Sequence, residues 1–144
     1  MPTGRLRPAT PDDAAQILQL SAALGYSLCS EAEQRQRLVT LQHSDRDQIW
    51  VYETESRLQG WIHFFQALRV ASDSFIEIGG LVVSEDSRRQ GIGQKLVQQA
   101  AEEAHKQQTT LRVRCNDKRK ATHQFYLSCG FSADKVQQVF RLTI

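Results

Sequence analysis

Cysteine is scarce in this 144-residue sequence, which contains only Cys29, Cys115 and Cys129. The three are far apart, no two have the Cys-x-x-Cys spacing of a metal site, and an odd number does not make a complete disulfide framework. No bound metal is therefore expected. Because unpaired thiols persist in reducing compartments, the cysteines favour a cytoplasmic location.

Long hydrophobic runs and a strong charge of one sign are also missing. No segment approaches the roughly 18–20 consecutive apolar residues of a membrane-spanning helix. Residues 1–5 are not followed by the apolar run of a secretion signal. The 18 Lys and Arg nearly balance the 16 Asp and Glu, which leaves a net charge of +2 and no long basic stripe. Membranes and nucleic acids are therefore not expected as partners.

The hydrophobic residues that are present, 40% of the total, are enough for one core. The sequence has no internal repeat, low-complexity segment or obvious linker. Residues 1–144 are therefore interpreted as a single domain.

The first part of the sequence predicts a strand and two helices. Residues 6–9 read as a short strand, and residues 10–13, Thr-Pro-Asp-Asp, read as a helix start. There Thr can cap, Pro suits the first helical position, and the acids favour the positive end of the helix dipole. This helix ends at Gly25. A second capping box at residues 30–33 opens a helix that continues through Leu41.

The middle of the sequence changes to strand patterns. Residues 49–53, 58–65 and 75–83 are rich in β-branched and aromatic side chains, and a polar turn separates the first two. The third run contains Gly79 and Gly80 in its interior. Adjacent glycines there predict a β-bulge or a place where another group approaches the backbone closely.

The last part alternates between helices and strands. Helical spacing covers residues 91–106 and 118–128, and strands are predicted at 111–115 and 136–144, with a possible short strand after Phe131. The predicted order is βααβββαβαβ. This order predicts a mixed α/β domain.

One loop carries a pattern that is suited to an anion. Residues 88–95, Arg-Arg-Gln-Gly-Ile-Gly-Gln-Lys, lie between a predicted strand and a predicted helix. Glycines let backbone N–H groups approach a pyrophosphate, and the helix start adds its dipole. The loop is not a dinucleotide fingerprint, because Leu96 replaces the third glycine, and no Gly-Lys-Ser/Thr follows as in a Walker loop. A tight turn without a ligand is the alternative interpretation.

Two motifs together resemble a known family. Arg88-x-x-Gly91-x-Gly93, after the apolar residues 81–83, is similar to the acetyl-CoA motif of the GNAT N-acetyltransferase superfamily. Residues 125–131, Phe-Tyr-Leu-Ser-Cys-Gly-Phe, resemble the family segment Phe-Tyr-x-x-x-Gly-Phe. Two motifs in the right order and the right strand or helix context are much less probable by chance than either motif alone.

The resemblance implies both a fold and a cofactor. The expected fold is an α+β arrangement of the GNAT type, a mostly antiparallel sheet with a bulged, splayed strand, flanked by the four predicted helices. The expected cofactor is acetyl-CoA, with CoA as product, and the main chain of Leu81, Val82 and Val83 is expected to pair with its pantetheine arm. The CoA pyrophosphate is expected to bind at Arg88, Arg89, Gln90, Gly91, Ile92, Gly93, Gln94 and Lys95.

The likeness extends to a subgroup. Further segments resemble bacterial enzymes that act on small amines and are related to aminoalkylphosphonate acetyltransferases. These segments are residues 23–26, 60–62, 77–83, Asn116, 123–126 and 139–140. Members of the family often form dimers, and the predicted last strand is a plausible contact of a homodimer.

Acetyl transfer to an amine sets requirements that name two candidate catalytic residues. An alkylammonium, with a pKa of about 10.4, must lose a proton before it attacks, and the departing sulfur must be stabilised. Glu77 lies 11 residues before Arg88, which resembles the position of the family's catalytic glutamate, and is the candidate base, acting directly or through water. Tyr126 matches the family tyrosine and is the candidate acid. A solvent-facing glutamate and a core tyrosine are the alternatives. The oxyanion donor is expected to be a backbone N–H near Val83.

Other polar residues near these motifs keep two interpretations. His123 shares a helix face with Tyr126 and either contacts CoA or substrate or is structural. Asn116 either binds the pantetheine or caps a turn. His63 is interpreted as structural and not as a ligand of the substrate. No neighbouring residues mark Cys115 or Cys129 as a thiolate nucleophile.

The acceptor pocket is expected at residues 24–30 and on the strand at 61–65. Tyr26, Trp61 and Phe65 are predicted to form an apolar or cation-binding wall, with Glu77 beside it. The predicted activity is direct transfer to a primary amine of a small molecule. The alternatives are an acyl-CoA-binding sensor without turnover, and an acetyltransferase for protein lysines or amino termini.

Overall fold

The computed structural model describes residues 4–26 and 29–144. The chain divides into two compact units, Met1–Val113 and Arg114–Ile144. The described part of the first unit contains a β-sheet and three α-helices, and the second contains one α-helix. In the part of the chain that the structure describes, no helix is both long and apolar enough to cross a membrane.

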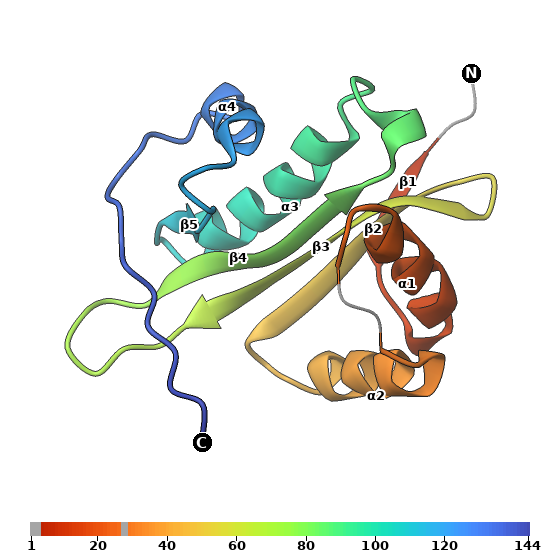
Figure 1. Cartoon of the computed structure of the whole chain (residues 1–144), viewed down its shortest axis with the longest axis horizontal. Coiled ribbons are helices and arrows are strands. Elements are labelled where there is room, and N and C mark those ends of the chain that lie inside the picture. The colour runs from red at the N-terminus through yellow and green to blue at the C-terminus, as the bar shows by residue number, and fades with distance from the viewer. Residues whose placement is uncertain (1–3, 27–28) are drawn as a thin grey trace. The chain divides into compact units, whose positions relative to one another are not determined.

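A five-stranded sheet organises the first unit, with the strands side by side in chain order (Figure 1). The neighbours β1 to β4 are antiparallel, and β5 is parallel to β4. This confirms the predicted mixed, mostly antiparallel fold. The strands are β1 (Arg5–Pro8), β2 (Asp47–Thr54), β3 (Arg57–Ala67), β4 (Phe75–Val83) and β5 (Leu111–Val113).

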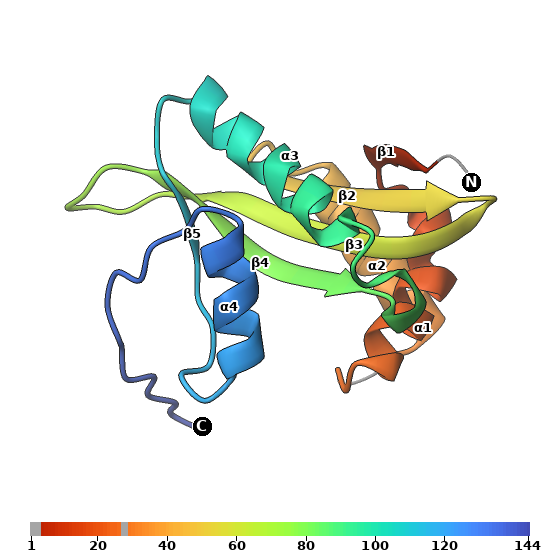
Figure 2. The ribbon, with the colours of Figure 1, turned by 90° about the horizontal axis from the view of Figure 1, so that it is seen from above.

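Helices cover both faces of this sheet. Helices α1 (Ala14–Ala23) and α2 (Glu31–Gln42) lie on one face and α3 (Ile92–Lys106) on the other (Figures 1 and 2). Alternation along β3 separates the two faces, because successive side chains of a strand point in opposite directions. Gly60 faces Leu96 of α3, and Trp61 donates a hydrogen bond to Ser21 of α1.

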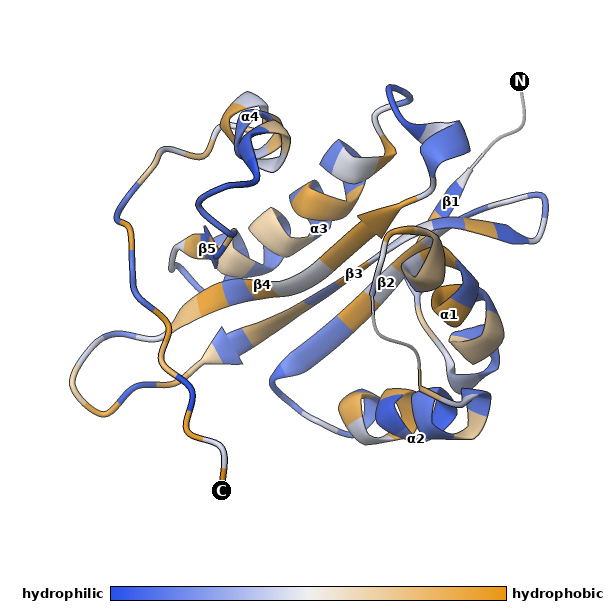
Figure 3. Cartoon of the chain, in the orientation of Figure 1, coloured by the Kyte–Doolittle hydropathy of each residue, from blue (hydrophilic) through white to orange (hydrophobic). Residues whose placement is uncertain are grey.

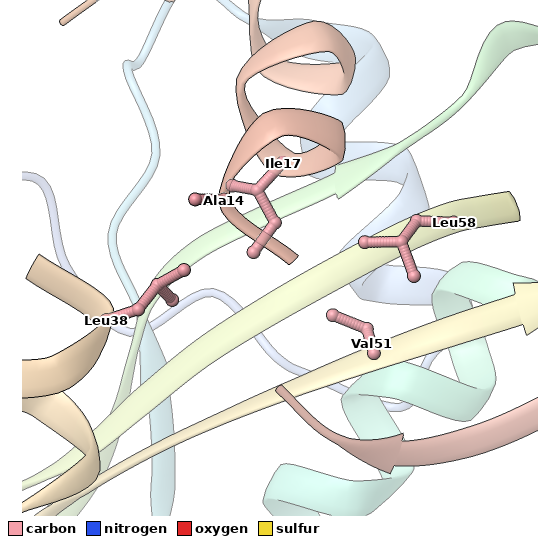
Figure 4. Close-up of a cluster of buried hydrophobic side chains, with 5 residues drawn as sticks. All are labelled: Ala14, Ile17, Leu38, Val51 and Leu58. Carbon is pink, nitrogen blue, oxygen red and sulfur yellow. The ribbon is translucent and has the colours of Figure 1, made fainter. Parts of the chain in front are cut away.

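Each face has its own core. Under α1 and α2, five side chains form a buried cluster (Figure 4). They are Ala14, Ile17, Leu38, Val51 and Leu58. Toward α3, the largest fully buried side chains include Ile62, Phe64 and Leu96. Figure 3 shows hydrophobic residues recurring along β4 and α3, whereas polar residues predominate on α2. The sheet is therefore packed on two sides, as the hydrophobic spacing of the sequence requires.

An ion-pair network holds the start of the first helical segment against the sheet. Arg7 of β1 donates to both carboxylate oxygens of Asp13, at 2.8 and 2.9 Å, and to Glu53 of β2 at 3.1 Å. The Thr10 backbone N–H donates to the same Asp13 carboxylate at 2.8 Å. Burial on its own raises the pKa of Asp13, but the hydrogen bonds from Arg7 and Thr10 outweigh it and lower the pKa below its ordinary value of 3.8.

Asp13→Asn is expected to lower the free energy of unfolding by about 2–3 kcal/mol at pH 7, because the half-buried Arg7 guanidinium loses a charged partner. The lowered pKa means that wild-type Asp13 adds stability above its ordinary pKa, and that this contribution is lost as pH falls through the folded-state value. Urea unfolding at pH 7 and pH 3 should therefore show a smaller difference at pH 3. Asp12→Asn is the control, since its pair with Arg35 is exposed. Equal losses in the two variants would contradict the prediction.

The main correction to the predicted elements concerns the C-terminus. The predicted strand at 136–144 and the possible short strand after Phe131 are absent, and residues 131–144 form neither helix nor strand. A strand needs a neighbour for its N–H and C=O groups, and a β-prone pattern alone does not supply one. The apolar side chains of this segment are exposed: Val136, Val139, Phe140, Leu142 and Ile144. Its role as a dimer contact stays a prediction.

Smaller differences affect helix ends. A 3-10 turn at Pro11–Asp13 precedes α1, so the regular helix begins at Ala14. The Ser30 hydroxyl caps α2 by accepting the Glu33 N–H at 3.1 Å, as predicted. Helix α4 (Lys120–Ser128) begins two residues later than expected, because Asn116 holds residues 116–119 in a turn.

Candidate active site

The predicted phosphate loop lies between β4 and the N-terminus of α3. A 3-10 turn at Glu85–Ser87 follows the strand, and Gly91 is the N-cap residue of α3. Its φ of +78° is in the left-handed region that favours glycine. The first N–H groups of an α-helix have no partner within the helix and can bind an anion. The loop therefore has the backbone geometry that a pyrophosphate site requires.

Positive side chains surround the same helix start. Arg88, Arg89 and Gln90 are exposed. Neither guanidinium group forms a hydrogen bond or ion pair with any residue that the structure describes, so both are available to an anion. Lys95 takes a different direction: its Nζ lies 5.3 Å from the centre of the Tyr52 ring and 3.4 Å from the Tyr52 hydroxyl oxygen.

The loop is fixed to the sheet by Gln59, a residue that the sequence analysis missed. Gln59 is the extra residue of a bulge in β3, since Tyr52 pairs with Gly60 and Glu53 pairs with Leu58. Its backbone C=O accepts the Ser84 N–H at 2.8 Å, and its side-chain oxygen accepts the hydroxyls of Ser84 and Ser87. No motif in the sequence marks Gln59, because its role depends on the bulge.

The paired glycines of β4 form the predicted bulge. His63 pairs with Gly80 and Phe64 with Ile78, which leaves Gly79 as the extra residue. The pairs between β4 and β5 stop at Ile78. Within the first unit, the β4 backbone from the bulge onward is thus unpaired with β5, as a strand that receives a cofactor arm requires.

Close packing explains why both positions are glycine. A Cβ at Gly79 would lie 2.9 Å from Nδ1 of His63, and a Cβ at Gly80 would lie 2.8 Å from the Trp61 ring. Both distances are shorter than real Cβ contacts. The bulge therefore places the rings of His63 and Trp61 directly against the backbone of β4.

Glu77 lies on the same face of the sheet as these rings. It pairs across the strands with Phe65, and Phe65 pairs with Asp47. Because paired residues of neighbouring strands share a face, Asp47, Phe65 and Glu77 form one row. His63 is two residues from Phe65, and its Nε2 lies 2.7 Å from Oδ1 of Asp47. Sequence reasoning treated His63 as structural and missed Asp47, which becomes its partner only through strand register.

The residues predicted to form the substrate wall also lie on this face. Tyr26 meets Trp61 edge to face, with ring centres 6.5 Å apart, and Phe65 meets His63 at 5.7 Å. The expected acceptor segment 24–30 is described except for residues 27 and 28, which lie outside the described residues. The structure thus brings Tyr26, Trp61, Phe65 and Glu77 to one side of the sheet.

The second unit holds the other predicted residues. Tyr126 is buried, and its ring packs edge to face on Phe125 and Phe131, at 5.1 and 5.4 Å. The His123 ring contacts the Asn116 backbone oxygen at 2.9 Å, and the Asn116 side chain accepts the Lys118 N–H. Asn116 and His123 therefore both make hydrogen bonds in the turn before α4, and their contacts with CoA stay a prediction.

The cysteines of the second unit lack the features of nucleophiles. Burial raises the pKa of the Cys115 thiol, opposed only in part by Arg119, and burial likewise raises that of Cys129. A raised pKa leaves less thiolate at neutral pH. Among the described residues, no group of three or more His, Cys, Asp or Glu side chains is arranged to hold a metal ion.

Comparisons with solved structures show the fold. An aminoglycoside antibiotic 6'-N-acetyltransferase, AAC(6')-IG from Acinetobacter haemolyticus, superposes with a TM-score of 0.83 over 97% of this chain and 99% of that one, at 16% identity. A putative acetyltransferase from Agrobacterium tumefaciens str. C58 gives 0.84 over 96% and 99%, at 23% identity. Glucosamine-6-phosphate N-acetyltransferase from Arabidopsis thaliana gives 0.83 over 98% and 99%, at 18% identity.

Sequence comparison shows the family. No curated protein matches the chain significantly. The family model of the acetyltransferase (GNAT) domain matches residues 45–133, more than half of the chain. The matched range includes the phosphate loop, the bulge and the segment around Tyr126. Acetyl-CoA is the acetyl donor of this family. The chain belongs to the GNAT family of N-acetyltransferases.

Proposed function

We propose that the protein transfers the acetyl group of acetyl-CoA directly to the primary amine of a small cationic molecule, within a single acetyltransferase domain. The observation that carries the proposal is the bulge at Gly79. The β4–β5 pairing stops at Ile78, just before this bulge, and β4 then continues toward the phosphate loop without pairing to β5. Glu77 lies on the same strand, two residues before the bulge. Cofactor-binding backbone and a carboxylate thus meet on one strand.

Acetyl-CoA supplies the activated acetyl group, and the residues of the chain have defined roles around it. Arg88, Arg89 and the first amides of α3 hold the pyrophosphate. The backbone of residues 81–83 pairs with the pantetheine arm, and an N–H near Val83 stabilises the developing oxyanion. Glu77 takes a proton from the ammonium, directly or through water, so that nitrogen can attack the thioester. Tyr126, which matches the family tyrosine, protonates the departing sulfur.

The acceptor face favours a cation. Asp47 and Glu77 contribute carboxylates, and Trp61, Tyr26 and Phe65 contribute aromatic surface. Such a combination binds ammonium groups by Coulomb and cation–π attraction. Arg112 of β5 pairs with Glu77 at the end of this row, so the amine panel, and not the charges of the face, has to distinguish polyamines and amino sugars from aminoalkylphosphonates. The three cysteines are free thiols, which fits a reducing compartment such as the cytoplasm.

Calorimetry with acetyl-CoA, followed by thiol release across an amine panel, tests the proposal. The panel contains polyamines, amino sugars, aminoalkylphosphonates, amino acids and lysine peptides. We expect saturable binding and turnover on a cationic small-molecule class. Binding without turnover on any amine would instead support an acyl-CoA sensor, and selective turnover of peptides would support a protein acetyltransferase. Absence of acetyl-CoA binding would overturn the proposal.

A further inference from the structure

The pair formed by Asp47 and His63 has the geometry of an oriented base. Nε2 of His63 lies 2.7 Å from Oδ1 of Asp47, and Oδ2 of Asp47 accepts the Ser44 hydroxyl at 2.7 Å. The Asp47 side chain is 20% exposed and the His63 side chain is 24% exposed. Asp47 is thus held by two hydrogen bonds, while the imidazole remains accessible from solvent.

This arrangement selects one tautomer of the neutral ring. A carboxylate can accept hydrogen bonds but cannot donate them. The neutral ring must therefore carry its proton on Nε2, and Nδ1 keeps its lone pair. Nδ1 lies against the bulge, 2.9 Å from the point where a Cβ of Gly79 would be. No residue that the structure describes donates a hydrogen bond to it. A proton acceptor is therefore aimed at the place where β4 separates from β5.

Charged side chains share the sheet face of the ring. Asp47 on β2 binds it directly, and Glu77 on β4 lies on the same face in the neighbouring cross-strand row. The positions that pair with His63, Ile49 and Gly80, are uncharged. Helix α1, which packs on β3, contains no ionisable residue. Asp47 and Glu77 are thus the carboxylates on this face, and Arg112 of β5, which pairs with Glu77, is the positive charge in the same row.

Amine acetylation releases two protons from nitrogen, and Glu77 accounts for one of them. The ammonium must lose the first before attack. Attack forms the C–N bond and leaves a positive nitrogen in the tetrahedral intermediate, which must lose the second as the C–S bond breaks. The sulfur gains one proton, so the balanced reaction is an ammonium plus acetyl-CoA giving the amide, CoA and one released proton.

We propose that Nδ1 of His63 accepts the second proton, with Asp47 as the positioning residue that fixes its tautomer. This inference rests on the proposed function and deepens it, because it gives the acceptor side of the site two bases with different tasks. His63 is a catalytic residue in this scheme, since it touches the reacting nitrogen. The competing explanation is that the pair only ties β2 to β3.

The experiment compares His63→Gln and Asp47→Asn with matched controls at exposed positions, His105→Gln and Asp45→Asn. Calorimetry measures acetyl-CoA binding, and kcat/KM is measured against pH for the best amine of the panel. A fluorinated alkylamine that is already neutral at the assay pH is measured as well. For such an amine the first proton is absent, so the effect of removing Glu77 should shrink while the effect of removing His63 persists.

We expect His63→Gln to lower kcat/KM by about 10²–10⁴-fold, the usual contribution of general-base catalysis, with unchanged acetyl-CoA affinity and an altered acid limb of the pH profile. If the pair had only a structural role, His63→Gln would change neither the pH profile of kcat/KM nor the dependence of kcat/KM on the amine. Nitrogen-15 NMR of the wild type should show the His63 tautomer protonated at Nε2, and Asp47→Asn should weaken that preference.

Three results would overturn the inference while leaving the proposed function standing. They are wild-type-like turnover in His63→Gln, an Nδ1-protonated tautomer in the wild type, and an effect of His63→Gln that shrinks on the neutral amine in parallel with that of Glu77→Gln. Absence of acetyl-CoA binding by the wild type would overturn the proposed function and this inference together.

Discussion

An Arg88→Glu/Gly91→Asp double variant is expected to lose at least about 100-fold in acetyl-CoA affinity. Each charge-assisted hydrogen bond to a phosphate contributes about 1.5–3 kcal/mol, and about 1.4 kcal/mol corresponds to a factor of ten. The variant removes a guanidinium that has no protein partner in the described chain and adds a carboxylate at the N-cap of α3, where the helix dipole favours the anion of the ligand. Isothermal titration calorimetry measures the change.

The matched control is Arg88→Gln/Gly91→Asn. Asn is nearly isosteric with Asp and tolerates the left-handed backbone of Gly91 better than most residues, so this control keeps the conformational change and omits the negative charges. We expect it to bind acetyl-CoA more weakly than the wild type but much more tightly than the charged variant. Equal affinities in the two double variants would show that backbone geometry, and not charge, governs binding. Wild-type affinity in the charged variant would place the pyrophosphate elsewhere.

The glycine-containing turn before α3 and the bulge in β4 could be predicted because both depend on local chemistry. A left-handed N-cap favours glycine whatever its surroundings, and Gly91 supplies it. Adjacent glycines inside a strand indicate a bulge, and the register confirms one at Gly79. The hydrophobic spacing of residues 92–106 likewise predicts α3 without knowledge of its neighbours. In each case the sequence segment contains the whole physical cause.

Features that depend on pairing between distant segments could not be predicted. The alternation of residues 136–144 indicates strand propensity, but formation of a strand requires a neighbour that the pattern does not name, and the segment forms no strand. Asp47 becomes the partner of His63 only because the β2–β3 register places Asp47 opposite Phe65. Gln59 can hold Ser84 and Ser87 only from its bulged position. A single sequence does not specify register at this level.

In the first unit, the proposed cofactor site and the proposed acceptor site lie at different parts of β4. The strand's C-terminal end leads into the phosphate loop and α3, where positive charge and free amides favour an anion. The row of Asp47, Phe65 and Glu77, which continues to Arg112 of β5, lies on the face of α1 and α2. The bulge at Gly79 lies between these two regions of β4, and therefore between the proposed cofactor site and the proposed acceptor site.

Glu77→Gln is expected to lower kcat/KM for a basic amine by about 10²–10⁴-fold, because the variant has no group at this position that can take the first proton from the ammonium. Gln keeps the shape of the side chain and the strand pairing with Phe65, so acetyl-CoA affinity should change little. Stopped-flow or steady-state thiol release gives the rates, and Glu102→Gln, at an exposed position of α3, is the control.

The dependence on the amine distinguishes catalysis by Glu77 from electrostatic binding of the cation. An amine that is already neutral does not need a base for its first proton. The loss of kcat/KM in Glu77→Gln should therefore diminish as the basicity of the amine falls, and the loss should appear in kcat and not in KM. A binding role would instead raise KM for every cationic amine and leave kcat unchanged. A Glu77→Gln enzyme that keeps wild-type kcat on a fully protonated amine would exclude Glu77 as the base. In that case the oriented imidazole of His63 would be the next candidate on this face for the first proton as well.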